Sequence, residues 1–498
     1  MMTGLATLTG QEVMGHRPWP RQIVSADVWR NAAQGLAGGL WTLSGLWGDD
    51  GMVHMALVDT TTLAVLSLPC PDGYFPSVGR LHSPAIRLER TILDLFGLLP
   101  GDAADTRPWL DHGCWPYVYP LGTRQKAPAA APYPFLAAEG ESIHQIPVGP
   151  VHAGIIEPGH FRFHANGETV VRLETRLGYT HKGIETLMQG ADLGRAAKLA
   201  GRVSGDSTVA YAIAFARAVE AALGIQVPVR AHWLRALMAE LERLANHLGD
   251  IGAICNDASF SLMLAHCAVL RERVLRAADA CFGHRLLRDL VVPGGVAMDL
   301  EARAPTALRA LVAEIGARFP ELVALYDNTA SLQDRTVATG ILKPGLALKF
   351  GAGGYIGRAS GRSFDVRRAF PYPPYDQLSF EVPVLEDGDV NARVWIRIRE
   401  VEQSLILIGQ ILSGLPEGAV QSDVPLRAGQ GLGLVEGFRG DILVWLRVTE
   451  DGTVARCHLR DPSWFQWPLL EAAIEGNIVA DFPLCNKSFN CSYSGCDL

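Results

Sequence analysis

The chain has 498 residues, of which 48% are hydrophobic and 19% are charged, and its formal net charge is −8. A chain of this length has room for two or more domains and a large core. The acidic balance, without a long basic run, argues against nucleic acid as the main partner. Nine cysteines at irregular spacings favour a reducing compartment over a disulfide framework.

The N-terminal residues 1–21 contain no basic segment followed by an apolar run, so no signal peptide is predicted. No window of about 18 residues is free of charges and of proline or glycine breaks, so no membrane span is predicted. The high hydrophobic content fits a polypeptide that buries surface against partners, and it fits a large independent enzyme equally well.

The first predicted module, residues 1–125, is a small α/β unit. Its apolar runs 52–58 and 64–68 have the character of strands. A helix is predicted over residues 86–96, and Gly97 directly after it is a typical helix stop.

A linker is predicted over residues 126–142, which are rich in alanine and proline and have no periodicity. The second module, residues 143–498, opens with a strand pair whose turn is marked by Asn166-Gly167. From residue 203 to about 330 the chain is predicted to be mostly helical, with apolar residues at three- and four-residue spacing over 234–248.

The stretch Gly201–Tyr211 is predicted to open a long helix. Ser204 and Ser207 are three positions apart, which would place both hydroxyls on one helical face. The later part of the second module is predicted to contain a strand at 380–384, a helix at 392–412, and strands at 442–448 and 456–460 joined by a turn at Asp451-Gly452.

A glycine-rich segment at residues 351–361 does not match a nucleotide-binding pattern. It lacks the Gly-x-x-x-x-Gly-Lys-Ser/Thr of a phosphate loop, and Gly351–Gly354 does not fit Gly-x-Gly-x-x-Gly. No direct nucleotide site is therefore predicted, and this includes NAD.

Several motifs occur in one order along the chain: Gly149-Pro-Val-His152, Glu157-Pro-Gly-His-Phe-Arg162, Gly178-Tyr-Thr-His181, Glu240-Leu-Glu-Arg243 and Phe380-Glu-Val-Pro383. Together they resemble the fused large subunit of formate hydrogenlyase and of related energy-converting (group 4) nickel–iron hydrogenases. That family joins modules similar to the C and D subunits of complex I (NADH-quinone oxidoreductase). The resemblance implies an α+β fold, with a small N-terminal α/β module followed by a mainly helical, hydrogenase large-subunit-like domain with small peripheral β-sheets.

The resemblance also locates the four positions that carry metal-binding cysteines in nickel–iron hydrogenases. They fall on Ser204, Ser207, Ser492 and Gly495. Nickel and iron in such sites need thiolates, whereas a serine hydroxyl stays protonated near neutral pH and glycine has no side chain. We therefore expect no nickel–iron centre and no directly bound cofactor. Two nearby cysteines are each one place away from the expected positions and are interpreted as structural thiols: Cys491 and Cys496.

The resemblance to the D subunit of complex I implies a polar cavity lined by four candidate catalytic residues, His152, His181, Arg202 and Asp257. Each has an alternative role. His152 can bond to backbone in a turn, and His181 can belong to a surface pair. Arg202 and Asp257 can form ion pairs, because a charge among apolar residues is rarely unpaired. The tyrosine that contacts quinone in the complex I family falls on Gly205, so one usual quinone donor is absent.

The resemblance implies a peripheral subunit on the inner, cytoplasmic face of the cell membrane. Its expected partners are a small subunit that carries an iron–sulfur cluster and antiporter-like membrane subunits. Such a protein would couple electron transfer from the iron–sulfur partner to quinone reduction, or to proton or conformational movement. Two alternatives remain open: a non-catalytic scaffold of the same kind of complex, and an active hydrogenase with atypical ligands.

Overall fold

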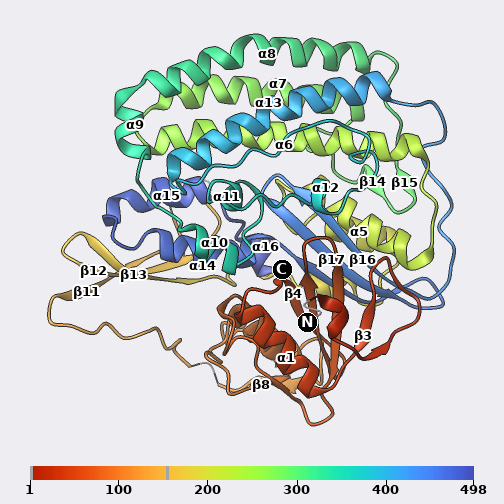
Figure 1. The fold of residues 1–498 in the computed structure, drawn as a ribbon, viewed down its shortest axis with the longest axis vertical. Coiled ribbons are helices and arrows are strands. Elements are labelled where there is room, and N and C mark those ends of the chain that lie inside the picture. The colour runs from red at the N-terminus through yellow and green to blue at the C-terminus, as the bar shows by residue number, and fades with distance from the viewer. Residues whose placement is uncertain (1–3, 130, 153–155) are drawn as a thin grey trace.

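Three layers make up the computed structural model, which describes residues 4–129, 131–152 and 156–498. Figure 1 shows long helices above a C-terminal sheet, and an N-terminal sheet below it. The fold is α+β, as predicted. None of the helices in the described residues combines the length and the apolar character that a membrane crossing requires.

The N-terminal layer is a five-stranded sheet with the order β1-β3-β6-β5-β4. A helix stop is confirmed at Gly97, which ends α2 with φ +73°. The predicted strands and the helix are present in this layer, which consists of β1 (Gln11–Glu12), β3 (Arg21–Ile23), α1 (Ala26–Ala37), β4 (Thr42–Asp49), β5 (Met52–Val58), β6 (Leu63–Pro69), β7 (Tyr74–Pro76), α2 (Ile86–Phe96) and β8 (Leu99–Gly101).

The C-terminal sheet has the order β18-β17-β16-β2, so one strand from the N-terminal region extends it. This strand, β2 (His16–Arg17), pairs in parallel with β16 (Gly429–Gly437). The predicted antiparallel pair is confirmed as β17 (Gly440–Val448) and β18 (Val454–Arg460).

Helix α5 (Thr208–Leu223) lies directly on β16. Glycines at alternate positions of β16 face α5, because successive strand residues point to opposite faces. A Cβ atom at Gly429, Gly431 or Gly433 would lie 2.1–2.3 Å from a carbonyl oxygen of the helix. The alternating glycines therefore permit a close approach that larger residues would prevent.

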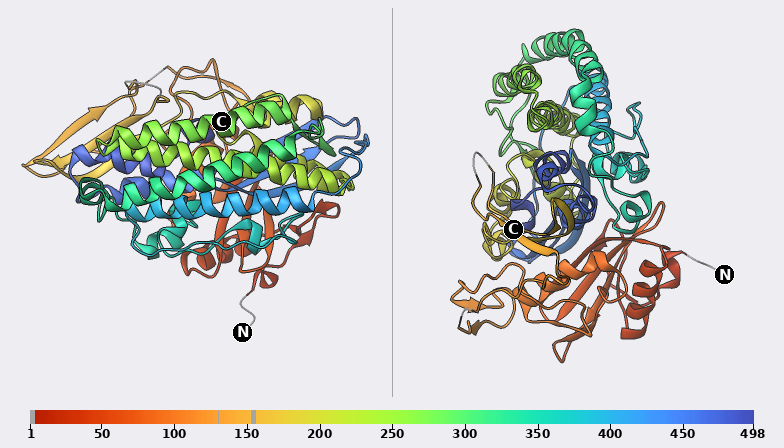
Figure 2. Two further views of the ribbon diagram at one scale, coloured as in Figure 1. Left: turned by 90° about the horizontal axis from the view of Figure 1, so that it is seen from above. Right: turned by 90° about the vertical axis from the view of Figure 1, so that its left-hand side faces the viewer.

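Four long helices form the upper layer and run side by side (Figure 2). The apolar stripe predicted over 234–248 is buried in the first of them, with Leu234, Leu237 and Leu244 fully enclosed. The helices are α6 (Val229–Asp257), α7 (Ser261–Phe282), α8 (Ala304–Asn328) and α13 (Val390–Gly414).

The remaining regular elements are short. The turn predicted at Asn166-Gly167 is confirmed between the second and third strands of a separate sheet, β11 (Ile143–Val148), β12 (His160–Asn166) and β13 (Thr169–Arg176). The others are β9 (Tyr117–Val118), β10 (Gln125–Lys126), α3 (Ile184–Met188), α4 (Leu193–Ala200), β14 (Val291–Val292), β15 (Gly295–Val296), α9 (Ala330–Thr336), α10 (Pro344–Lys349), α11 (Gly354–Arg358), α12 (Val366–Ala369), α14 (Ser463–Ala473), α15 (Phe482–Phe489) and α16 (Ser494–Asp497).

Two predicted elements are wrong. The helix predicted from Gly201 starts only at Thr208, so Ser204 lies in the preceding turn and does not share a helical face with Ser207. The segment 380–384 forms no strand, because its backbone bonds to side chains instead of a neighbouring strand.

The domain boundaries at 125 and 143 stay a prediction, although the described residues between β10 and β11 contain no helix or strand.

Candidate functional site

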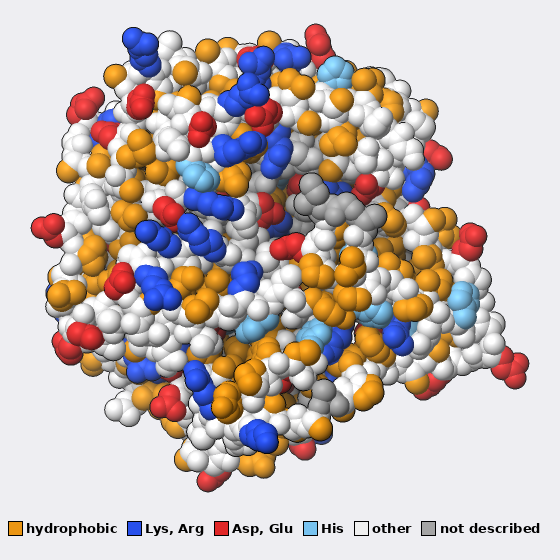
Figure 3. Space-filling view, turned by 180° about the vertical axis from the view of Figure 1, so that it is seen from behind, with side chains coloured by type: hydrophobic (Ala, Val, Ile, Leu, Met, Phe, Trp, Pro, Cys, Tyr) orange, Lys and Arg blue, Asp and Glu red, His pale blue; other side chains and the backbone are white. Residues whose placement is uncertain are grey.

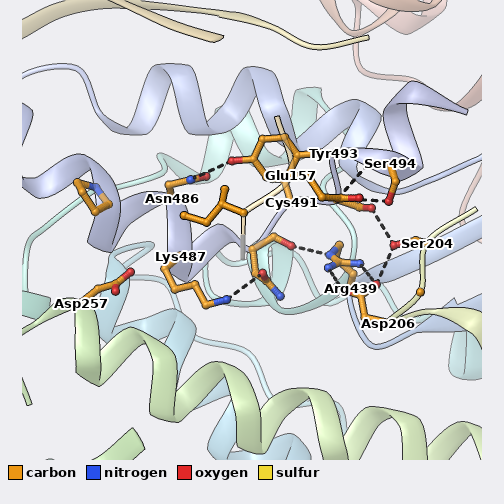
Figure 4. A pocket seen from close by; sticks show the side chains of 15 residues that line it. Glu157, Ser204, Asp206, Asp257, Arg439, Asn486, Lys487, Cys491, Tyr493 and Ser494 are labelled. Atoms are coloured by element: carbon orange, nitrogen blue, oxygen red, sulfur yellow. Dashed lines mark hydrogen bonds and ion pairs between the residues drawn. The ribbon is translucent and has the colours of Figure 1, made fainter. Parts of the chain in front are cut away.

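A cavity of about 370 Å³ lies between the turn before α5, the end of α6 and the C-terminal segment (Figure 4). Most of its lining side chains are polar or charged. The lining residues are Ile156, Glu157, Ser204, Gly205, Asp206, Asp257, Arg439, Pro483, Asn486, Lys487, Asn490, Cys491, Ser492, Tyr493 and Ser494.

Two of the four predicted degenerate ligand positions, Ser204 and Ser492, line this cavity, and Ser207 and Gly495 lie beside them. The hydroxyls of Ser204 and Ser492 are 2.8 Å apart and share a hydrogen bond. The backbone N–H of Gly495 donates to Ser492 Oγ at 2.9 Å. Ser207 Oγ donates to Asp206 at 3.2 Å, and Ser204 Oγ lies 2.8 Å from the same carboxylate oxygen. Two segments far apart in the sequence are thus joined by hydroxyl hydrogen bonds.

An ion pair between Arg439 and Asp206 borders these hydroxyls. Arg439 sits in the turn between β16 and β17 and donates to both Asp206 oxygens, at 2.5 and 3.1 Å. Its Nη1 is also 3.2 Å from Ser207 Oγ, and its Nε donates to the Asn490 carbonyl at 2.6 Å. Burial alone would raise the pKa of Asp206, but the guanidinium and the serine hydroxyls lower it, so the carboxylate stays ionised.

A buried carboxylate leaves no room for a side chain at position 495. Asp461 is fully enclosed and accepts hydrogen bonds from the Tyr211 hydroxyl at 2.7 Å and from the Ser463 N–H at 2.8 Å. A Cβ atom at Gly495 would lie 2.5 Å from Asp461 Oδ2. No side chain, and hence no cysteine, fits at 495 unless Asp461 moves.

Of the four candidate catalytic residues, Asp257 lies in the cavity wall, at the C-terminal end of α6. Burial raises the pKa of its carboxyl, and the positive charge of Lys487 partly offsets this rise. Protonation of Asp257 is therefore easier than that of a carboxyl in water.

The other three candidates are not among the residues that line this cavity. The His152 ring is 2.8 Å from the Gly159 carbonyl, and the His181 ring is 2.5 Å from the Asp497 carbonyl. Arg202 forms an ion pair with Asp289 and is 39% exposed. The contacts of His152 and Arg202 match the alternative roles noted for them, whereas His181 bonds to backbone and not to a surface partner. A catalytic role for the three stays a prediction.

Sequence reasoning missed several cavity residues, namely Glu157, Asp206, Arg439 and Lys487. Asp206 stands between the two serines, which is a visible signal. Arg439 stands in a hairpin turn between two glycines, and no local pattern connects that turn with residue 206.

The cysteines near the cavity are poor thiolates. Burial raises the pKa of both Cys491 and Cys496, which favours the protonated thiol. Within the described ranges, no group of three or more His, Cys, Asp or Glu side chains is arranged to hold a metal ion.

Two family models match the chain. The model described as "Respiratory-chain NADH dehydrogenase, 49 Kd subunit" matches residues 257–428 and 422–498. The model described as "Nickel-dependent hydrogenase" matches residues 182–249. Most residues that line the cavity lie in one match or the other: Ser204, Gly205 and Asp206 in the hydrogenase match, and Asp257, Arg439 and residues 483–494 in the NADH dehydrogenase match. Fold and site therefore define a class shared by hydrogenases and respiratory NADH dehydrogenases.

Curated relatives narrow this class. Formate hydrogenlyase subunit 5 of Escherichia coli (strain K12) is 33% identical over 438 residues, covering 85% of this chain and 77% of the relative. The D subunit of the NADH-quinone oxidoreductase of Dehalococcoides mccartyi is 32% identical over 341 residues, covering 67% of this chain and 92% of the relative. The chain belongs to the family that contains these two proteins and hydrogenase-4 component G, as its motifs predicted.

A solved structure supports the same assignment. It is titled "Structure of the membrane-bound sulfane sulfur reductase (MBS), an archaeal respiratory membrane complex". The matching chain has a TM-score of 0.68 and 26% sequence identity, and the match covers 72% of this chain and 99% of that chain.

Proposed function

We propose that this chain is the large peripheral subunit of a membrane-associated oxidoreductase complex of the complex I and hydrogenase type, and that it holds no nickel–iron centre. In this proposal electrons arrive from a small iron–sulfur partner. Antiporter-like membrane proteins hold the complex at the inner face of the cell membrane. The cavity couples electron arrival to proton or conformational movement, or to quinone reduction.

The observation that carries this proposal is the hydrogen bond between Ser204 and Ser492, flanked by the Arg439 guanidinium. Protonated hydroxyls are weak donors to nickel and iron, which favour thiolates in such sites. A guanidinium 3.2 Å from Ser207 Oγ adds positive charge where metal cations would bind. The donor set therefore does not fit a nickel–iron centre.

We assign to Asp257 the uptake and release of the proton that is coupled to electron arrival. A negative charge that arrives in a neighbouring protein raises the proton affinity of a nearby carboxyl. The pKa of Asp257 is already raised by burial, so a modest change in the field shifts its protonation. A proton held there can be released toward a reduced quinone or toward the membrane partners.

A partly basic surface next to the cavity supports docking of an electron-donating partner. A second cavity shares Gly205 and Asp206 with the first, and its lining includes Arg271, Arg285 and Arg288. Figure 3 shows Lys and Arg side chains gathered beside a hollow on the face opposite that of Figure 1. Such a surface favours an acidic partner, because complementary charges speed association.

Metal analysis of the purified complex tests the first part of the proposal. We expect nickel far below one equivalent per chain and no hydrogen uptake, because the donor set contains no thiolate at the four positions. Nickel at one equivalent together with hydrogen uptake would instead establish an active hydrogenase with atypical ligands.

Substitution of Asp257 separates a catalytic role from a scaffold role. Asp257→Asn removes the titratable group and keeps the shape, so proton movement coupled to electron transfer should fall at least about tenfold. Asp279→Asn, the same change on the exposed face of α7, is the matched control. Size-exclusion chromatography confirms assembly of both variants. Unchanged coupling in an assembled Asp257→Asn complex would favour the scaffold.

A further inference from the structure

A cleft of about 430 Å³ lies apart from the candidate site, at the C-terminal end of α5, where β2 joins β16. Its lining includes three arginines and no aspartate or glutamate. The arginines come from three separate segments: Arg17 from β2, Arg427 from the loop before β16, and Arg447 from β17.

Two of these guanidinium groups converge on the glycine that ends α5. Gly224 has φ +58°, and a Cβ atom there would lie 3.0 Å from Arg17 Nη1 and 3.0 Å from Arg427 Nη2. The two nitrogens are therefore within twice that distance of each other. Like charges this close repel, and the repulsion is relieved when an anion lies between them.

The protein itself compensates only part of this charge. Arg447 donates to both oxygens of Asp49, each at 3.0 Å. Among the described residues, neither Arg17 nor Arg427 has a side-chain hydrogen bond or an ion pair. The end of α5 carries only about half a negative charge, which is less than the two arginines supply.

The floor of the cleft is rigid. Gly429 at the start of β16 packs on Ala222, with a Cβ position 2.3 Å from the Ala222 carbonyl oxygen. Behind it, Arg21 is 6% exposed and donates to Gln430 and Ser67, which fixes this part of the wall. A preformed cleft loses little conformational entropy when a ligand binds.

We propose that this cleft binds a phosphate-bearing anion. The planar guanidinium presents paired N–H donors that match the oxygens of a phosphate, and the contact is both charge-assisted and bidentate. Two uncompensated guanidiniums facing one space suit a group with two or more negative charges. The inference does not depend on the function proposed above, because none of these residues lines the candidate cavity.

Calorimetric titration of the full chain with pyrophosphate tests the proposal. We expect saturable binding that the double variant Arg17→Gln/Arg427→Gln weakens at least about tenfold. Arg318→Gln/Arg399→Gln removes the same charge from exposed helix positions and should bind like the unchanged chain. Binding should weaken as salt rises, because exposed charges are screened. Equal weakening in both variants would overturn the proposal.

Sedimentation with lipid vesicles distinguishes a free phosphate compound from a lipid headgroup. Vesicles containing phosphatidic acid should retain the chain more than neutral vesicles do, and the cleft variant should lose this difference, if the ligand is a lipid. Binding of pyrophosphate without vesicle retention identifies a free phosphate compound. The anion site is refuted if both double variants have normal unfolding midpoints and the cleft variant changes neither pyrophosphate binding nor retention by vesicles.

Discussion

At residue 495, glycine allows the Asp461 carboxylate to lie where the Cβ atom of any other residue would be. Asp461 in turn is held by Tyr211, which is fully buried. Three residues from α5, the end of β18 and the C-terminal segment thus occupy a space that a metal ligand would need. The lack of room for a side chain at residue 495 comes from the contacts among these three residues and not from any one of them alone.

Gly495→Ala should reduce the free energy of unfolding by about 1–3 kcal/mol, since its Cβ atom would overlap Asp461 Oδ2. Gly316→Ala on α8 is the control, because no atom lies within 4 Å of its Cβ position. Alanine there should stabilise the helix by about 0.5–1 kcal/mol. Chemical unfolding measures both values, and a neutral Gly495→Ala would contradict the predicted overlap.

Helix α2 is connected to the rest of its layer by a buried carboxyl. Asp94 Oδ2 accepts hydrogen bonds from the N–H groups of Trp109 and Leu110 at 2.8 and 2.7 Å. Burial raises the pKa of Asp94 to about 6, although these hydrogen bonds oppose the rise. The folded chain therefore binds a proton here at a pH where the unfolded chain has released it.

The contribution of Asp94 to the free energy of unfolding should accordingly fall as pH rises from about 4 to about 6, because the folded state then holds more protons at this group than the unfolded state does. The expected loss is about 2–3 kcal/mol for this group. Asp94→Asn keeps an oxygen acceptor and removes the titration, so the unfolding free energy of the unchanged chain should fall relative to that of the variant over this range. Urea unfolding across this pH range compares the two chains, and parallel pH profiles would refute the raised pKa.

The sequence predicted helix and strand ends correctly where the residues at the end itself determine it. Gly97 and the hairpin at Asn166-Gly167 are examples, because a left-handed backbone or a tight turn requires particular residues at that place. The start of α5 was misplaced because its first N–H groups bond to Glu242, which lies on α6. A short window of sequence cannot show a contact between residues that are more than 30 positions apart, such as Val209 and Glu242.

In the candidate site, too, the sequence predicted some residues and missed others. The family motifs assigned Ser204, Ser492 and Asp257 to one site, and the three residues line one cavity, while their roles stay a prediction. They did not reveal Arg439 or Asp461, whose partners lie far away in the sequence. A motif transfers positions between relatives, but it does not show which distant side chains contact those positions in the folded chain.

Across the whole molecule, the N-terminal and C-terminal sheets are joined by buried contacts. Arg460 is fully enclosed and donates to the Ser44 carbonyl at 2.7 Å. The rings of Trp47 and His458 stack with centroids 5.0 Å apart. Removal of either sheet would leave buried polar groups without partners, which is strongly destabilising.

The two regions should therefore unfold together, even though the sequence divides into modules. In native-state hydrogen exchange, the amides of β5 and those of α6 should be protected by similar free energies at each denaturant concentration. Exchange of β5 well before α6 would show that the N-terminal sheet opens independently.

The pairing of β2 with β16 also bears on how the chain is made. Synthesis proceeds from the N-terminus, so His16 and Arg17 leave the ribosome long before their partner strand exists. Arg439, Asp461 and the C-terminal segment, which complete the cavity, also arrive last. The short strand β2 thus has no partner through most of translation, and the C-terminal sheet can form only after β16 has emerged.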